Sequence, residues 1–566
     1  MMGRRPRARA LLIPLLALLA GCAGIPTSGP IQQGPEVQDG QADQVIRVIV
    51  RPPQPDMTPT QIVSGFIEAS ASFENDHAIA RQYLTAEAAA SWDPSEGTRV
   101  YDGVPTLAPN GPADVDMTAT LAGAITADGR FQVSPGRLLS ESFTLDYVEG
   151  QWRIANPPPG LLLARSDIDR AFRSYDVYFL DPEFTTLVPD TRLIPADGPG
   201  LATSLIQALA AGPTDWLAPA VRTALPDGTG LVVNAVPVQE GVAVVDLDAS
   251  VRLANDATRR ALSAQIVWTL RQVPGVLAVD LRAGGQALPV PGVANPQPEE
   301  AWGAFDPNGM PPNARPYAVR NGRVVEVTGP APLAVPGGAG LGAPPLDGIA
   351  VTLDAGRVAG LDDQGSLWSA ETRAGAASTN LITEPGQSRP SFGRGTSAWV
   401  VGPDQQLKQA LVDGTVFTIP IDGLSPKMRM ESVSVSRDGT RAALIVRRGP
   451  RTFVMLAVIV LQEGAARVQS PVRVDARLTN VTDVAWAEDD RLIALGAEGA
   501  GAPQVYEIDL ARASVRSLGA PTDPLRIAAA PGFAPLAASA DGQIYSYAGG
   551  PWVSVGFGGS PAYPGS

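Results

Sequence analysis

The last part of the chain, residues 317–566, repeats a unit of strand, turn and strand, and this repeat limits the possible folds more than any other feature. Each unit pairs two apolar strands across a turn that carries glycine or aspartate, as in residues 432–446 (SVSVSRDGTRAALIV). Its period of about 40 to 50 residues is typical of the blades of a β-propeller. Five clear units begin near Ile349, Arg389, Ser432, Asp483 and Arg526.

A sixth unit is expected from the two ends of this region. Residues 317–327 (YAVRNGRVVEV) could join the C-terminal strands and close the ring, so six blades are expected, with five or seven as alternatives. The Asp-Gly pairs at 438–439 and 541–542 predict tight hairpin turns, because glycine tolerates positive φ. Residues 363–368 (DQGSLW) resemble the structural Asp-box turn of sialidases, and the glycine-rich residues 338–342 are interpreted as a loop without phosphate-binding context.

The N-terminus carries a lipoprotein signal that ends at Cys22. Four arginines precede an apolar run at residues 10–20, and Leu-Ala-Gly stands directly before the only cysteine. This pattern predicts cleavage before Cys22, an S-diacylglycerol on its thiol and an N-acyl group such as palmitate. An uncleaved membrane anchor is the alternative, but the run is shorter than the about 20 residues that a bilayer requires. A later apolar run, residues 453–461, fits a buried strand better than a span.

The chain is acidic, with a formal net charge of −14. Removal of residues 1–21 takes four arginines away and leaves about −18. Such a charge disfavours binding to nucleic acid or to anionic lipid headgroups. Residues 22–44, rich in glycine, proline and glutamine, are expected to form a flexible tether between the lipid and the folded body.

The inventory of reactive side chains is small. With one cysteine and one histidine, His77, these 566 residues cannot assemble a Ser-His-Asp triad, a Cys-His pair or a His/Cys metal cluster. Asp246, Asp248 and Asp280 are interpreted as solvated or capping carboxylates near strand ends. We therefore expect no enzyme activity, no cofactor and no metal, while a glycosidase that uses two carboxylates remains an alternative.

Residues 45–160 are expected to form an α+β domain. A strand at 45–50 precedes a helix that begins at Thr58 or Thr60 and places four apolar residues on one side. A second helix around 79–84 is followed by strands near 115–121, 129–133 and 142–147, and by a terminal strand at 150–154 (GQWRI). The domain resembles the fold of nuclear transport factor two. Either a filled core or a hydrophobic pocket is compatible with this pattern.

Residues 172–290 form an α/β unit after the stiff linker at 156–160 (NPPPG). Its expected elements are strands at 175–181, 193–195, 241–247 and 276–281, with helices at 200–211 and from Asn255 or Asp256 onward. The order of short motifs, including LVPDTRLIP and GVAVVDL, resembles the GerMN domain of spore-germination proteins. That resemblance implies an interaction or assembly module. A Pro/Gly-rich linker at 291–316 follows.

The whole order of parts resembles the LpqB family of actinobacterial lipoproteins, and residues 51–66 (RPPQPDMTPTQIVSGF) match its N-terminal signature. The near absence of lysine agrees with an actinobacterial source. The resemblance implies a multi-domain α+β and all-β protein, anchored by lipid at the extracytoplasmic face of the cell membrane. It also implies a partner, the extracytoplasmic domain of an MtrB-type sensor histidine kinase, and modulation of MtrA–MtrB two-component signalling in cell division and envelope homeostasis. A cell-wall glycan or peptide binder and a GerMN-type assembly scaffold are alternatives.

Overall fold

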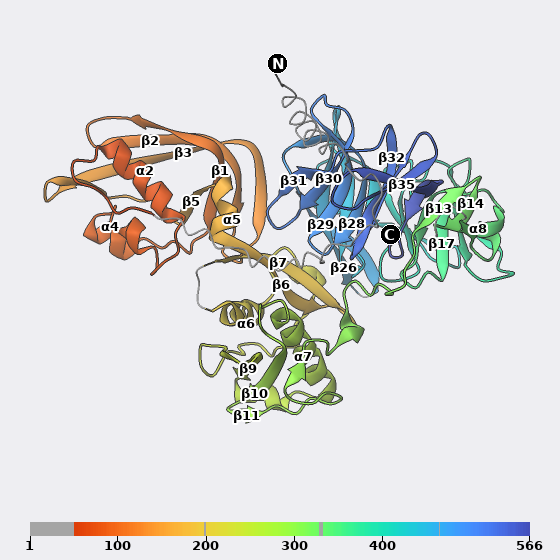
Figure 1. The fold of residues 1–566 in the computed structure, drawn as a ribbon, viewed down its shortest axis with the longest axis horizontal. Helices are drawn as coiled ribbons and strands as arrows, with labels where there is room; N and C mark the ends of the chain where they lie inside the picture. Colours follow the sequence, from red (N-terminus) through yellow and green to blue (C-terminus); the bar gives the residue numbers. More distant parts are fainter. Residues whose placement is uncertain (1–49, 197–199, 328–331, 463) are drawn as a thin grey trace, which may run out of the picture. The chain divides into compact units, whose positions relative to one another are not determined.

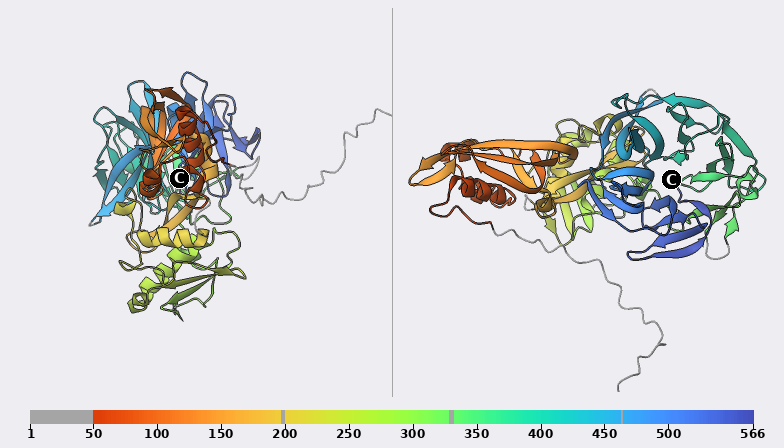
Figure 2. Two further views of the ribbon diagram at one scale, coloured as in Figure 1. Left: turned by 90° about the vertical axis from the view of Figure 1, so that its left-hand side faces the viewer. Right: turned by 90° about the horizontal axis from the view of Figure 1, so that it is seen from above.

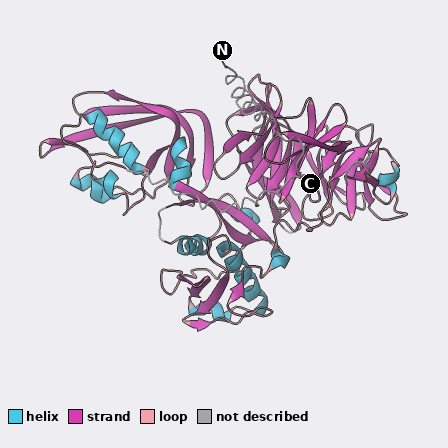
Figure 3. Ribbon diagram, in the orientation of Figure 1, coloured by secondary structure: helices cyan, strands magenta, loops and turns pink. Residues whose placement is uncertain are grey.

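The computed structural model describes residues 50–196, 200–327, 332–462 and 464–566, all within one compact unit, Val48–Ser566 (Figure 1). The predicted signal, Cys22, the tether and residues 45–49 of the first predicted strand lie outside the described residues. Strands dominate, and the helices occur almost entirely in the first half of the chain (Figure 3). The predicted multi-domain fold, α+β followed by all-β, is confirmed.

Three helices open the first domain: α2 (Pro59–Ser70), α3 (Ala78–Arg81) and α4 (Ala86–Ser91). Thr58 begins α2 with a capping box, because its hydroxyl accepts from the Gln61 backbone N–H at 3.4 Å while the Gln61 side chain accepts from the Thr58 N–H at 2.8 Å. The predicted apolar side of α2 is buried. Phe66 packs edge-to-face on Trp92, with ring centroids 5.3 Å apart.

Five strands form the sheet beneath these helices, in the order β4-β3-β2-β1-β5. Their bounds are β1 (Thr98–Pro109), β2 (Asp114–Ile125), β3 (Phe131–Val148), β4 (Gln151–Ile154) and β5 (Leu161–Ala164). β1 to β4 pair antiparallel, and β5 returns after residue 160 to pair parallel with β1. The sequence pattern missed β1 and β5. It also divided β3 in two, because Pro135 and Gly136 lie at a bulge within that one strand.

The second domain begins with a short helix, α5 (Ile168–Ala171), and the antiparallel hairpin of β6 (Phe172–Leu180) and β7 (Leu187–Pro195). Two helices follow, α6 (Leu201–Ala211) and α7 (Asp256–Leu270), and both agree with the predicted segments. The Asn255 side chain caps α7 by accepting from Thr258 N–H at 2.9 Å. Buried Gln265 on α7 donates to the Tyr178 carbonyl and accepts from Ala224 N–H, which fixes the helix against β6.

A small sheet completes the second domain. α7 connects β9 (Val242–Leu247) to β10 (Ala278–Ala283), and these two strands are parallel. The shorter strands are β8 (Val238–Gln239), β11 (Gln286–Ala287) and β12 (Gln297–Pro298). The 3₁₀ turns of the chain are η1 (Arg165–Asp167), η2 (Ala218–Ala220), η3 (Ala249–Leu253) and η4 (Gly303–Phe305).

The third domain is a propeller of six four-stranded blades, as predicted; the right-hand view of Figure 2 shows them arranged in a ring. The closing blade contains β36 (Gly559–Ala562), β13 (Tyr317–Arg320), β14 (Arg323–Glu326) and β15 (Leu333–Ala334). The next two blades are β16 (Asp347–Val351), β17 (Arg357–Leu361), β18 (Leu367–Glu371) and β19 (Ser378–Ile382), then β20 (Ser391–Phe392), β21 (Ala398–Val401), β22 (Leu407–Ala410) and β23 (Val416–Ile419).

The remaining three blades have longer strands. They are β24 (Arg429–Val435), β25 (Arg441–Arg448), β26 (Arg451–Gln462) and β27 (Ala465–Arg473); β28 (Leu478–Glu488), β29 (Arg491–Glu498), β30 (Gln504–Asp509) and β31 (Ser514–Ser517); and β32 (Pro524–Ala530), β33 (Phe533–Ser539), β34 (Gln543–Tyr547) and β35 (Trp552–Phe557). A single bridge between Thr452 and Asn480 joins two of these blades into one eight-stranded sheet. Every predicted unit begins within or just before the first strand of a blade.

The ring closes as the sequence predicted, because β36 pairs antiparallel with β13. One prediction for this domain is wrong: residues 338–342 do not form a plain loop, since they contain the one-turn helix α8 (Gly338–Leu341). Its glycines allow close packing, because a Cβ on Gly340 would lie 1.7 Å from the Val335 carbonyl oxygen.

Candidate functional site

The lipidation site predicted from sequence, Cys22, lies outside the described residues, so the structure gives it no surroundings. Within the described ranges, no helix has both the length and the apolar character that crossing a membrane requires.

The three aspartates weighed as acid/base candidates have structural partners. Asp246 accepts from Gly285 N–H at 2.9 Å, and Asp248 accepts from Gly230 N–H at 2.7 Å. Asp280 lies within β10, where it pairs with Arg282 at 2.6 Å and accepts from the Asn295 amide. These contacts fix turns and strand ends, and they favour the capping interpretation over the catalytic one.

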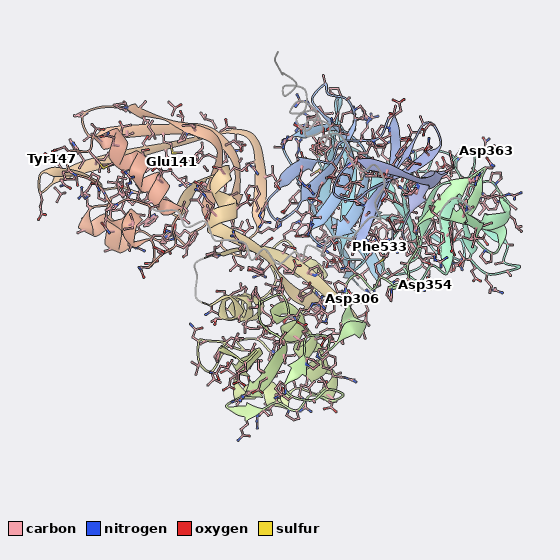
Figure 4. The ribbon with its side chains drawn as sticks, viewed as in Figure 1. Glu141, Tyr147, Asp306, Asp354, Asp363 and Phe533 are labelled. Carbon is pink, nitrogen blue, oxygen red and sulfur yellow. The ribbon has the colours of Figure 1, made fainter. Side chains whose placement is uncertain are left out.

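The Asp-box-like turn is organised by Asp362 instead of Asp363. The Asp362 carboxylate accepts from the backbone N–H of Ser366 at 2.9 Å and from the Trp368 indole N–H at 2.8 Å. Asp363 is exposed beside it at the edge of the blade (Figure 4). The motif is a structural hairpin, as the sequence interpretation held.

Two arginines and the C-terminal segment fill the centre of the propeller. Arg437 donates to the carbonyls of Pro564, Trp486 and Ala529 at 3.2 to 3.3 Å. Arg389 reaches carbonyl groups of three other blade strands and lies 3.4 Å from Asp483. The donors of both guanidinium groups are thus used within the fold, and the right-hand view of Figure 2 places the C-terminus inside the ring.

The outer side of the propeller carries a large groove of about 980 Å³. It lies between β23 and the β26–β27 hairpin, and Phe417, Leu461 and Arg467 are among its lining residues. Phe417 is 49% exposed and Leu461 38% exposed. Arg467 pairs with Asp422 at 2.7 Å beside it. The lining is mixed, because Arg222 of the second domain and Gln409 also contribute to it. An open groove of mixed polar and apolar character is suited to a protein partner.

The sequence analysis did not single out the groove. β23 is the outermost strand of its sheet, and three of its four residues are exposed, including Val416 and Phe417. The available signal was this pair of apolar residues directly after the turn at Asp413 and Gly414. A strand pattern alone does not distinguish the outer strand of a blade from an inner one.

Potential metal ligands do not gather in the structure: across the described residues, no group of three or more His, Cys, Asp or Glu side chains could hold an ion.

Comparison with protein families assigns each domain. Residues 52–169 match the family described as "Lipoprotein LpqB, N-terminal domain", residues 322–564 match "Lipoprotein LpqB beta-propeller domain", and residues 176–289 match "Sporulation and spore germination". Among solved structures, the first GerMN domain of GerM from Bacillus subtilis is 23% identical, with a TM-score of 0.18, over 20% of this chain and 86% of that one. TolB from Acinetobacter baumannii is 15% identical, with a TM-score of 0.34, over 45% and 68%.

Relatives that are similar to this chain over nearly its whole length share the same name. "Lipoprotein LpqB" of Thermobifida fusca is 32% identical over 627 residues, which cover 97% of each chain. The protein of the same name from Streptomyces avermitilis is 30% identical and covers 97% of this chain and 96% of the relative. This membrane-anchored lipoprotein therefore belongs to the LpqB family.

Proposed function

We propose that this protein is held by Cys22 at the extracytoplasmic face of the membrane and binds the sensor domain of an MtrB-type histidine kinase. The observation that carries the proposal is its similarity to LpqB lipoproteins over 97% of both chains, which includes all three domains. Its role is to modulate MtrA–MtrB signalling without chemistry of its own. The structural partners of the carboxylates described above agree with a binding role.

Regulation follows from preferential binding. A partner that binds one state of the kinase more tightly than the other shifts the population toward that state by the difference in affinity. The lipid anchor adds to this effect, because it keeps the body near its membrane-embedded target and raises the effective concentration.

The groove beside β23 is the surface that we assign to this contact. Phe417 and Leu461 supply exposed apolar area, and large apolar side chains of this kind dominate the energetics of protein interfaces. Phe557, on the outermost strand of another blade, is 58% exposed and provides a matched comparison outside the groove.

The test measures binding of residues 48–566 to the isolated sensor domain by titration calorimetry, together with autophosphorylation of the full-length kinase. We expect binding, a changed rate of autophosphorylation, and at least a tenfold loss of affinity in Phe417→Asp but not in Phe557→Asp. Equal losses in both variants would reject the groove. No binding at tens of micromolar, with retention on purified cell wall, would favour the glycan-binding alternative. Binding that leaves autophosphorylation unchanged would favour a scaffold.

A further inference from the structure

The hairpin between β25 and β26 carries a concentration of positive charge at one end of its propeller blade. Five exposed cations define this basic patch: Lys427 and Arg429 where β24 begins, and Arg447, Arg448 and Arg451 at the hairpin. They belong to three adjacent strands, because β25 lies between β24 and β26. The chain as a whole has a net charge of −14, so the patch opposes the general charge of the molecule.

Strand pairing places like charges of the patch directly opposite one another. Arg429 faces Arg447 across β24 and β25. Arg448 faces Arg451 across β25 and β26. Like charges in such positions are destabilising. Arg447 is compensated by an ion pair with Glu431, whereas the Arg448 and Arg451 side chains make no ion pair or hydrogen bond with any residue that the structure describes.

Cations on the two neighbouring blades are paired. Lys408, in β22 of the preceding blade, lies 2.8 Å from the Glu384 carboxylate. Arg477, directly before β28 of the following blade, lies 2.7 Å from the Glu498 carboxylate. The four cations of the patch other than Arg447 have no such partner among the described residues. The patch is therefore a local exception to the charge pairing around it.

Arg473, at the end of β27, adds positive charge behind the patch. Its guanidinium lies 4.6 Å from the centre of the Phe453 ring and donates to the Leu478 carbonyl at 3.0 Å. Burial lowers the pKa of Arg473, and the charge of Arg451 lowers it further against the opposing effect of Asp475. The two guanidinium groups thus repel each other, and a bound anion would relieve this repulsion.

The acidic net charge of the chain does not prevent a local contact with an anionic surface. Exposed charges that lie farther away than the Debye length, about 8 Å at physiological salt, are largely screened. A surface that touches the patch therefore interacts mainly with its cations, while the acidic remainder of the molecule is repelled. Such a contact favours one orientation of the propeller.

The lipid anchor places one anionic surface permanently within reach. About 28 residues separate Cys22 from Val50, and a fully extended chain of this length spans at most about 100 Å. The anchor thus holds the body at a high effective concentration near the bilayer. Clusters of about four to eight lysines or arginines bind anionic lipid headgroups, and each cation near the surface contributes about fivefold in affinity.

We propose that the basic patch binds the headgroups of anionic phospholipids in the membrane to which the protein is anchored, and so orients the propeller on the bilayer. The groove beside β23 includes Leu461, which lies at the other end of β26 from Arg451. The two contacts therefore use opposite ends of this strand. The inference rests on the membrane anchor and not on the proposed kinase contact.

Vesicle flotation of residues 48–566, the compact unit without the anchor, tests this proposal. The vesicles contain phosphatidylcholine alone or an equal mixture with phosphatidylglycerol, at about 50 mM salt. We expect at least about fivefold stronger binding to the mixed vesicles, and loss of this binding at about 500 mM salt because the charges are then screened. Equal binding to both vesicles, or no binding to either, would overturn the proposal. Patch-dependent binding of polyglutamate in the absence of vesicle binding would overturn the lipid assignment in favour of an acidic protein partner.

A second hairpin supplies a matched control. Arg320 and Arg323 are exposed and face each other across β13 and β14, the second and third strands of the closing blade, as β25 and β26 are of theirs. Arg448→Glu with Arg451→Glu should weaken binding to the mixed vesicles at least about tenfold, whereas Arg320→Glu with Arg323→Glu should change it less than about twofold. Both double variants change the net charge equally. Equal losses would show that net charge alone governs binding, and would overturn the patch.

Discussion

Arg437 and Pro564 are 127 residues apart in sequence, yet the Arg437 guanidinium donates to the Pro564 carbonyl oxygen from both Nε and Nη2, at 3.3 and 3.2 Å. The same side chain donates to Trp486 and Ala529, in two further blades. It therefore fastens the segment after β36 to the centre of the ring. This complements the strand pairing between β36 and β13 that closes the propeller.

The first prediction concerns this arginine. Arg437→Met removes a buried charge that serves three carbonyl groups, and leaves them unpaired, so we expect a loss of about 3 kcal/mol from the free energy of unfolding of the propeller. Hydrogen exchange of peptides from residues 559–566, together with the thermal midpoint, measures the effect. The matched control is Arg447→Met, because Arg447 pairs with Glu431 at the exposed surface and should lose less than about 1 kcal/mol. Equal hydrogen-exchange protection of residues 559–566 in the two variants would contradict the role of Arg437 in holding this segment.

The second prediction separates the two threonines that the sequence offered as the start of α2. Thr58→Ala should cost about 1 kcal/mol of helix stability, because it removes the acceptor of the Gln61 N–H from the capping box. Thr60→Ala replaces a residue inside the helix and should change stability by less than about 0.5 kcal/mol. Native-state hydrogen exchange of α2 measures both. A larger effect at Thr60 would show that the helix begins elsewhere.

Local signals were strong enough to predict most of the fold. The helices α2, α6 and α7 were correctly predicted, because capping residues and a 3.6-residue apolar period coincide there. The blades were predicted because the same strand–turn–strand unit recurs five times. One such unit is a weak signal, but its repetition at a regular spacing indicates a propeller. The pairing of β13 with the C-terminal strands was predicted because a propeller ring must be closed.

The errors arose where long-range pairing decides the structure. β1 is mostly exposed beyond Tyr101, and it owes its existence to pairing with β2 and β5. The open pocket beside His77 was equally hidden, because its lining extends from Phe73 to Pro195, which are more than 100 residues apart in sequence. The sequence showed a single histidine near a helix, but not that its Nδ1 would be buried without a partner.

The third prediction concerns the glycines of α8, which the sequence analysis interpreted as a loop. Gly340→Ala would place a Cβ against the Val335 carbonyl, so we expect a loss of about 2 kcal/mol or more, since the backbone must move. Gly395→Ala is the control, because a Cβ at that position meets no atom within 4 Å. Thermal unfolding compares the two variants. Equal midpoints would show that the backbone of the β14–β15 region moves without a loss of stability.

The fourth prediction tests the anchor. Cys22→Ser removes the thiol that the lipid requires, so the protein should move from the detergent phase to the aqueous phase in Triton X-114 partition, and should no longer incorporate labelled palmitate. Ser28→Ala, in the same tether, should leave both properties unchanged. Retention of Cys22→Ser in the membrane fraction would show that another part of the chain provides the attachment.

The fifth prediction uses the pKa of His77. Burial lowers this pKa below its ordinary value of 6.5, and Arg81 lowers it further, while Asp76 and the carbonyls of Ser70 and Ser72 oppose the shift. The folded protein therefore binds this proton less readily than the unfolded chain does. The resulting contribution to stability is present above about pH 6.5 and is lost as the pH falls from there through the folded pKa.

Titration of the single histidine by NMR measures both states, the folded protein in buffer and the unfolded chain in urea. We expect the folded value to be the lower of the two. The melting temperature of the unmodified protein should then fall more between pH 7.5 and pH 5.5 than that of His77→Asn, which cannot take up the proton. A folded pKa at or above the unfolded one would show that Asp76 and the backbone carbonyls of Ser70 and Ser72 outweigh the effect of burial.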